Sequence, residues 1–290
     1  MFVHGDNIAK KKRDKIKYND DSANIFIADI EKEYGKWKAL NIKLQGPLAS
    51  DEDRNASEIL TVRVEWFNQY KNFIDQQKYA EKFDSRSNLH SSVLEEFMYY
   101  LFKDLVNGYS SNAIIGKSKS FKDIFFISKN YSDMLKTPDP RVETKDHDFV
   151  IGVKIETAMH CFGSQESVKI DIEVPAVAIE CKTYLDKTML EASSTAAAQL
   201  KMRNPNALYI VVSEWLKLSE NVNLKKYQVD QIFILRKQKN TDREDRYRKG
   251  YIKNPICPDV VEYLFKIVRS HLSADWKGVV SYGLDRGYLI

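Results

Sequence analysis

Hydrophobic residues in the first part of the chain recur at intervals of three and four, which is the spacing of amphipathic helices. A helix is predicted from about Ser22, with Ile27, Ile30, Tyr34 and Trp37 on its apolar side. Two more are predicted after a loop at 46–54. Their apolar residues are Ile59, Val62, Trp66, Phe67, Tyr70, Phe73 and Ile74 within 56–83, and Leu89, Val93, Leu94, Phe97, Leu101 and Leu105 between Asn88 and Gly108. Residues 1–20 are polar, and we expect them to be flexible.

Beyond Gly108 the pattern changes to that of β-strands. The predicted strands are 123–128, 148–159, 168–173, 174–183, 207–213 and 231–236, and the predicted helices are 187–203 and one that follows Pro258. The segments 148–159 and 168–173 should form a hairpin that turns through Gly163-Ser164. The first part of the chain is therefore expected to be helical and the rest to contain a sheet.

The order of these elements predicts an α/β fold. A strand at 176–183, a helix at 187–203 and a strand at 207–213 have the order of a βαβ crossover, so the two strands should be parallel. A mixed central sheet with helices on both faces buries the whole pattern. At 290 residues the chain could form one large domain or two. We expect a helical N-terminal region with a basic arm at 1–84 and a sheet-containing core at 85–290.

The composition is that of a folded protein in a reducing compartment. Hydrophobic residues make up 43% and charged residues 30% of the chain, which is typical of globular proteins. No apolar run approaches the roughly 20 residues that cross a bilayer, and the N-terminus lacks the apolar segment of a secretory signal. Cys161, Cys181 and Cys257 form no C-x-x-C pair, which argues against a disulfide framework or a structural zinc site. We expect a cytoplasmic protein without a membrane partner.

Basic residues cluster in two segments, although the net charge is only +4. The N-terminal arm at 9–17 holds Lys10, Lys11, Lys12, Arg13, Lys15 and Lys17, and a charged loop near 236–253 holds Arg236, Lys237, Lys239, Arg243, Arg246, Arg248, Lys249 and Lys253. Either run alone is typical of a solvated, mobile segment. A site acting on nucleic acid between them would make both candidates for phosphate contacts, and the second also for reading guanine.

The apolar strand from Ala176 ends in Ile179-Glu180-Cys181-Lys182. Alternate side chains of a strand share a face, so Glu180 and Lys182 should project together while Cys181 points the other way. Glu-x-Lys is common on solvated strand faces, but packing alone gives no reason to end a buried strand with such a pair. The sequence therefore marks this strand end as a candidate site.

Asp148 supplies a second carboxylate, at the start of a predicted strand that would hold it rigidly. Mg²⁺ prefers hard oxygen ligands and keeps several waters, so Asp148, Glu180 and the carbonyl of Cys181 are the predicted metal ligands. Lys182 would orient the attacking water or stabilise the transition state, and beside two carboxylates it should stay charged. We predict a Mg²⁺-dependent DNA nuclease with Asp148, Glu180 and Lys182 as catalytic residues.

Other side chains compete for parts of this site. The alternatives for the first carboxylate are Asp146, Asp139 and Asp171. His90 and His147 lack the spacing of a histidine-metal nuclease, so we interpret both as incidental.

Two adjacent glutamates of the third helix, Glu95 and Glu96, are either additional ligands or part of a solvated helix face. Gln199 and Lys201 follow the Glu-x-Lys strand on a helix and could approach DNA. Nothing in the sequence decides between these readings.

The segments around these residues resemble the PD-(D/E)XK nuclease superfamily and, within it, Type II restriction endonucleases of the BbvCI kind. The similarity rests on residues 89–97, 146–152, 179–191 and 204–218, and covers roughly residues 85–220. One departure is His147, which stands where the motif has proline before its first aspartate.

This resemblance implies cleavage of double-stranded DNA at a short specific sequence in a host-defence system, with Asp148, Glu180 and Lys182 as the catalytic set. It also implies two different subunits, each with one active site that cuts one strand. A homodimer on a palindromic site is the alternative assembly. The chain alone would then be inert or weakly active.

Two other functions remain open. A repair or junction-resolving nuclease of the same superfamily would share the site but would prefer flaps or junctions to plain duplex. A DNA-binding subunit with a vestigial site would show no turnover, although an intact Asp, Glu and Lys set argues against it. The first two helices, rich in Trp and Tyr, could form either an internal core or a subunit interface.

Overall fold

The computed structural model describes residues 2–14, 16–83, 88–239 and 250–276, together with Leu284 and Gly287. The helices are α1 Val3–Arg13, α2 Asp21–Lys43, α3 Asp53–Ile74, α4 Gln77–Lys82, α5 Leu89–Asn107, α6 Tyr131–Met134, α7 Lys187–Arg203 and α8 Pro258–Ser273, and the strands are β1 Ile114–Phe126, β2 Pro140–Met159, β3 Val168–Leu185, β4 Leu208–Leu216 and β5 Gln231–Ile234. The strands form one sheet in the order β1-β2-β3-β4-β5. β1, β2 and β3 are antiparallel neighbours, whereas β3, β4 and β5 run parallel. The predicted mixed sheet and parallel βαβ crossover are confirmed.

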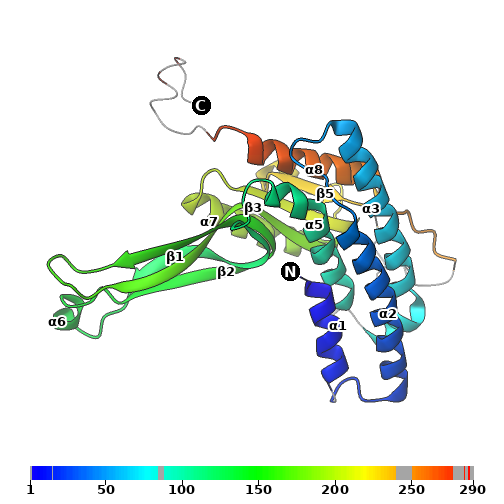
Figure 1. The fold of residues 1–290 in the computed structure, drawn as a ribbon, viewed down its shortest axis with the longest axis horizontal. Coiled ribbons are helices and arrows are strands. Elements are labelled where there is room, and N and C mark those ends of the chain that lie inside the picture. Colours follow the sequence, from blue (N-terminus) through cyan, green and yellow to red (C-terminus); the bar gives the residue numbers. More distant parts are fainter. Residues whose placement is uncertain are drawn as a thin grey trace.

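Helices cover both faces of the sheet (Figure 1). Alternate residues of the central strands, such as Ile179, pack into the large core that contains α5 and α8. Residues of the opposite parity, such as Ala178 and Tyr209, pack against the alanines of α7. The small side chains of α7 let this helix lie close to the sheet, which explains its alanine-rich sequence.

The N-terminal helices extend the larger core outward from α5. Trp37 of α2 stacks on Tyr70 of α3 at 5.1 Å between ring centroids, and both are buried, so these aromatic residues form an internal core. The predicted helix over 56–83 is two helices, because the chain leaves helical geometry between α3 and α4. The buried face of α3 also contains Arg63, which donates to the main-chain carbonyls of residues 41, 44 and 46. The buried face of α3 therefore differs from the predicted one, because apolar spacing does not count a buried arginine.

The N-terminal segment is a helix, so the prediction that residues 1–20 are flexible is wrong for α1. His4, Ile8 and Lys11 lie on one side of α1 and are buried. The N–H groups of His4 and Gly5 donate to Oε2 of Glu96 on α5, at 2.9 and 3.3 Å. The polar composition hid this helix because its buried face holds one aliphatic side chain and two basic ones.

β1, β2 and β3 extend beyond the helices as a long arm (Figure 1). β2 pairs with β1 over 140–152 and with β3 over 149–159, so it belongs to two hairpins. The register shifts at Gly152, where a Cβ atom would lie only 2.4 Å from the carbonyl oxygen of Val174. Glycine at this position permits the close approach of β2 to β3. The turns of the two hairpins meet through a hydrogen bond from Ser164 to the Lys136 carbonyl.

Two strand predictions are corrected by the arm. The segments 168–173 and 174–183 form a single strand, β3, because the chain remains extended through Pro175. The segment 123–128 is only the end of β1, which begins at Ile114. The first half of β1 alternates between exposed lysines, Lys117 and Lys119, and buried small residues, Gly116, Ser118 and Ser120. Its buried face therefore lacks the large apolar residues that give a strand signal.

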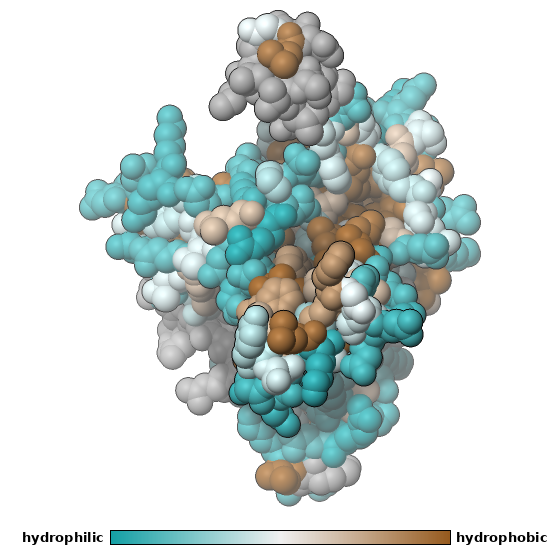
Figure 2. All heavy atoms as spheres, turned by 90° about the vertical axis from the view of Figure 1, so that its left-hand side faces the viewer, coloured by the Kyte–Doolittle hydropathy of each residue, from teal (hydrophilic) through white to brown (hydrophobic). Residues whose placement is uncertain are grey.

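The end of the arm carries exposed apolar side chains, from the end of β1, from α6 and from the 160–167 turn. They are Phe125, Phe126, Ile127, Tyr131, Met134, Leu135 and Phe162. Figure 2 looks onto this side of the molecule and shows hydrophobic residues gathered near its centre, ringed by hydrophilic ones. Among the described helices, none is long and apolar enough to span a membrane. All three cysteines are free thiols.

Candidate active site

Asp148 lies where β2 and β3 separate. The β2–β3 ladder ends at the pair Phe149 and Ile179, while β3 continues to pair with β4 as far as Leu185. Beyond the last pair, Oδ2 of Asp148 accepts the main-chain N–H of Cys181 at 2.9 Å. A side chain thus takes the place of the next ladder hydrogen bond, and it fixes this carboxylate against the edge of β3.

Lys182 joins this carboxylate to that of Glu180. Its Nζ atom lies 3.0 Å from Oδ2 of Asp148 and 2.8 Å from Oε2 of Glu180. Glu180 and Lys182 project together, as predicted, and the side chain of Cys181 packs into the core on the other face. The side chains of Asp148 and Lys182 keep 23% and 25% of their surface exposed, so the cluster remains open to solvent. The three predicted catalytic residues are therefore in contact.

The electrostatics favour the ionised form of Glu180 and the charged form of Lys182. Burial disfavours the Glu180 carboxylate, but the hydrogen bond from His147 and the Lys182 charge outweigh burial and hold its pKa well below the ordinary range. Burial likewise disfavours the ammonium of Lys182, but Asp148 and Glu180 outweigh it and raise the lysine pKa. Both groups are charged at neutral pH.

His147 and Tyr209 contact the same glutamate, so the interpretation of His147 as incidental is wrong. Nδ1 of His147 lies 3.2 Å from Oε1 of Glu180, and the hydroxyl of Tyr209 donates to that oxygen at 3.1 Å. The register between β1 and β2 shifts here: two residues of β2, Asp148 and Phe149, lie opposite one residue of β1. Such a bulge redirects side chains, which explains how adjacent residues of β2 reach the same cluster.

Glu95 of α5 lies beside the cluster and is buried, so it is not part of a solvated helix face. Burial, followed by the negative charge of Asp148, raises its pKa to about 7. Its Oε2 atom has no hydrogen-bond partner among the described residues. Glu96 is also buried but belongs to a different cluster, where it accepts hydrogen bonds from Tyr34 and Tyr100.

The competing aspartates do not join the site. Asp139 pairs with Arg141, and Asp171 pairs with Lys154 on the arm. Asp146 is exposed. On α7, Lys201 pairs with Asp230, while the side chain of Gln199 is half-buried.

The basic residues beside β5 are mostly committed to other contacts. Arg236 is fully buried and pairs with Glu214 at 2.9 Å, and Lys253 pairs with Asp75 at 3.1 Å. Burial makes Arg236 unavailable to DNA, contrary to the expectation from the charged loop. Lys237 and Lys239 are exposed and pair with Asp259 and Glu220. Arg243, Arg246, Arg248, Lys249 and Lys15 lie outside the described residues.

The oxygen donors of the cluster suit a hard cation. No group of three or more His, Cys, Asp or Glu side chains in the described ranges is arranged to hold a metal ion. The cluster instead offers two carboxylates on a partly solvated strand edge, and the remaining ligands of Mg²⁺ in such a site are main-chain carbonyls and water. The donor set therefore fits Mg²⁺ better than zinc, which prefers His and Cys.

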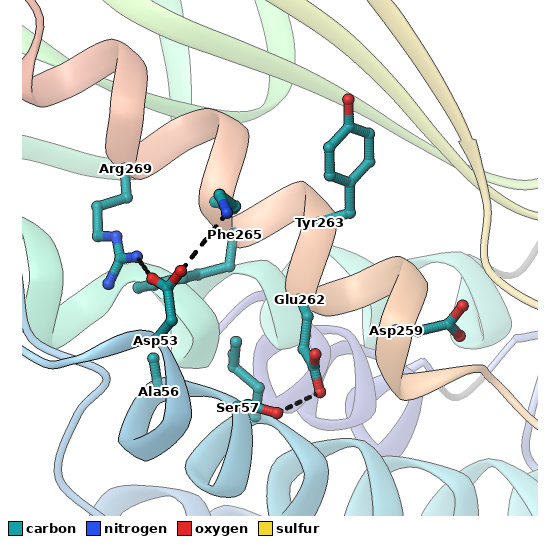
Figure 3. Close-up of a pocket in the computed structure, with 10 residues that line it drawn as sticks. Asp53, Ala56, Ser57, Asp259, Glu262, Tyr263, Phe265 and Arg269 are labelled. Carbon is teal, nitrogen blue, oxygen red and sulfur yellow. Dashed lines mark hydrogen bonds and ion pairs between the residues drawn. The ribbon is translucent and has the colours of Figure 1, made fainter.

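A separate pocket lies between α3 and α8 (Figure 3). Two pairs of its polar side chains point toward one another: Arg269 pairs with Asp53, and Ser57 donates to Glu262 at 2.7 Å. None of the predicted site residues lines it. These contacts hold α8 against α3. The β2–β3 fork therefore remains the candidate active site.

Comparison with known proteins gives the fold and the family of the chain. Among curated proteins, none matches the sequence significantly. Among solved structures, a chain of the "native BbvCI A2B2 tetramer at low resolution" has a TM-score of 0.66 and 19% sequence identity, over 94% of this chain and 97% of that one. The chain therefore shares the fold of that structure. The family model of the Bpu10I restriction endonuclease matches residues 86–289, which include the whole cluster, and the chain belongs to that family.

Proposed function

We propose that this chain is one subunit of a Type II restriction endonuclease, and that it hydrolyses one strand of double-stranded DNA at a specific short sequence with Mg²⁺. The observation that carries the proposal is the triangle of Asp148, Glu180 and Lys182 at the β2–β3 fork. The triangle is partly buried, but two of its members remain about one quarter exposed, so a metal ion and a phosphate could reach it.

Asp148, Glu180 and the main-chain carbonyl of Cys181 would hold the metal. In an extended strand the N–H and C=O of one residue point to the same side. The N–H of Cys181 points to Asp148, so its carbonyl is directed toward the same fork. Bound Mg²⁺ would polarise the phosphate and lower the pKa of an attacking water.

Lys182 would act as a fixed positive charge. Its raised pKa keeps it protonated at neutral pH, so it cannot accept a proton from water. Held between two carboxylates, it is preorganised to stabilise negative charge that develops on the phosphate or to orient the attacking water.

Cutting both strands requires two such sites, and each chain provides one. The neighbouring solved structure is a tetramer of two kinds of subunit, so we propose a second, related endonuclease subunit as the partner, with a homodimer as the alternative. The exposed apolar end of the arm supports a protein contact, because large apolar patches on soluble proteins mark such surfaces. The free thiols are consistent with action in the cytoplasm.

The test is cleavage of supercoiled plasmid by the purified chain with Mg²⁺, alone and with the candidate partner subunit. We expect discrete ends at one sequence, mapped by run-off sequencing, and no product with EDTA. Lys182→Ala should abolish cleavage. Lys187→Ala, which removes an exposed lysine of α7 nearby, should leave it intact.

Three results would overturn the proposal or part of it. Cleavage at flaps or junctions in preference to duplex would favour a structure-specific nuclease. Random degradation would remove sequence specificity. Binding without cleavage, even with the partner present, would indicate a non-catalytic DNA-binding subunit.

A further inference from the structure

The Glu180 carboxylate is held by hydrogen bonds from buried side chains. The terminal torsion of a glutamate is broad, so the residue's own rotamer preference does not fix the plane of its carboxylate. Here Oε1 receives two hydrogen-bond donors while Oε2 faces Lys182. The two oxygens therefore have different surroundings, and rotation of the carboxylate would break contacts on both sides.

Both donors belong to the rigid interior. The side chain of His147 is 2% exposed and that of Tyr209 is fully buried. Their rings meet edge to face at 5.6 Å between centroids, so each supports the other. Because an ionised carboxylate can only accept, Nδ1 of His147 must carry the hydrogen of this contact.

We propose that His147 and Tyr209 are positioning residues for the metal ligand Glu180. By holding Oε1, they keep Oε2 directed toward Lys182 and the metal. This inference rests on the proposed function, since it assigns a role within the same site. Neither residue touches the reacting atoms, and a histidine can reach Glu180 from the position before Asp148 because β2 is bulged there.

The test compares tyrosine variants that lose one buried hydroxyl each. Tyr209→Phe removes the donor to Glu180. Tyr227→Phe is the matched control, because the Tyr227 hydroxyl is buried and has no hydrogen-bond partner among the described residues. Mn²⁺ binding to the full-length chain is measured by electron paramagnetic resonance of the free ion, together with Mg²⁺-dependent plasmid cleavage.

We expect Tyr209→Phe to bind Mn²⁺ about 10- to 100-fold more weakly, the usual effect of removing a group that orients a metal ligand. Its cleavage should recover at high Mg²⁺ concentration, because the metal would reorient the carboxylate once bound. His147→Ala should have the same effect, and His147→Asn should restore part of the affinity, since its amide places an N–H donor near the Nδ1 position. Tyr227→Phe should resemble the wild type.

Wild-type Mn²⁺ affinity in Tyr209→Phe and in a folded His147→Ala variant would overturn the inference while leaving the nuclease proposal intact. Loss of affinity in Tyr227→Phe as well would show that the effect reflects general destabilisation, and would also overturn it. Absence of Mn²⁺ binding and of cleavage by the wild-type chain with its partner would remove the proposed function, and with it this role. Circular dichroism of each variant establishes that it is folded.

Discussion

Two of the clusters that join carboxylates to cations among the described residues have sharply different environments. The cluster at the fork joins Asp148 and Glu180 through Lys182, with about one quarter of Asp148 and Lys182 exposed. The second cluster, between the N-terminal helices and the end of β4, joins Asp75 and Glu214 to Lys71, Arg236 and Lys253. Lys71, Glu214 and Arg236 are 1% exposed or less.

The comparison teaches that residue types do not distinguish a reactive cluster from a structural one. Glu214 contacts Lys71 at 2.8 Å and Arg236 at 2.9 Å, so each of its oxygens faces a cation inside the protein. Glu180 contacts one cation, at a strand edge where the backbone ladder has ended. A metal and a phosphate can reach the cluster at the fork but not the closed cluster around Glu214. Access to solvent therefore marks the fork as the candidate for chemistry.

The same substitution in both clusters should separate these roles, and the largest effect is expected at the fork. Glu180→Gln should reduce cleavage by about 10³-fold, because it weakens metal binding, which supplies several kcal/mol to such reactions. Its unfolding should remain cooperative, since Asp148 still pairs with Lys182. Single-turnover cleavage and urea unfolding measure the two quantities, and unchanged cleavage would exclude Glu180 from the site.

Glu214→Gln should show the reverse pattern. It leaves the buried cations Lys71 and Arg236 short of a negative partner, and breaking a buried ion pair costs about 3–5 kcal/mol. The free energy of unfolding should fall by that amount, while the cleavage rate per folded molecule stays near that of the wild type. If cleavage were lost without a loss of stability, this cluster would have a functional role instead.

Glu95 should give the fork a pH dependence opposite in sign to that of the closed cluster, where the pKa of Glu214 is lowered by Lys71 and Arg236 despite burial. The pKa of Glu95 is raised from 4.5 to about 7 in the folded protein, so the folded state binds more protons than the unfolded state between these values. Its contribution to stability is therefore complete below about pH 4.5 and is lost as the pH rises through about 7, a change of about 3 kcal/mol at most. Urea unfolding of the metal-free protein in EDTA should show that Glu95→Gln flattens this decline, and an unchanged slope would contradict it.

The smallest effect is expected for an exposed cation beside the closed cluster. Lys239 pairs with Glu220, but both side chains are about half exposed or more. Exposed pairs often contribute nothing measurable to stability, so Lys239→Ala should leave the melting temperature unchanged. A clear drop would show that exposure does not separate structural from dispensable pairs in this region.

Much of the fold followed from hydrophobic spacing, because that spacing reports burial directly. The helices α2, α5 and α8 and the parallel pair β3 and β4 lie close to their predicted positions. The sequence-based predictions were wrong where charged side chains are buried. α1 buries His4 and Lys11, and α3 buries Arg63, so their inner faces look polar in the sequence.

The sequence by itself determined that Glu180 and Lys182 lie side by side, because strand alternation places residues two apart on one face. It also favoured Asp148, since that residue leads into an apolar strand. Only the tertiary structure decided the rest. A bulge in β2 turned His147 toward Glu180, and the packing of α5 brought Glu95 beside Asp148. Burial at the end of β4 withdrew Arg236 from any contact with DNA. These outcomes depend on contacts between residues far apart in the chain, and such contacts cannot be predicted from local spacing.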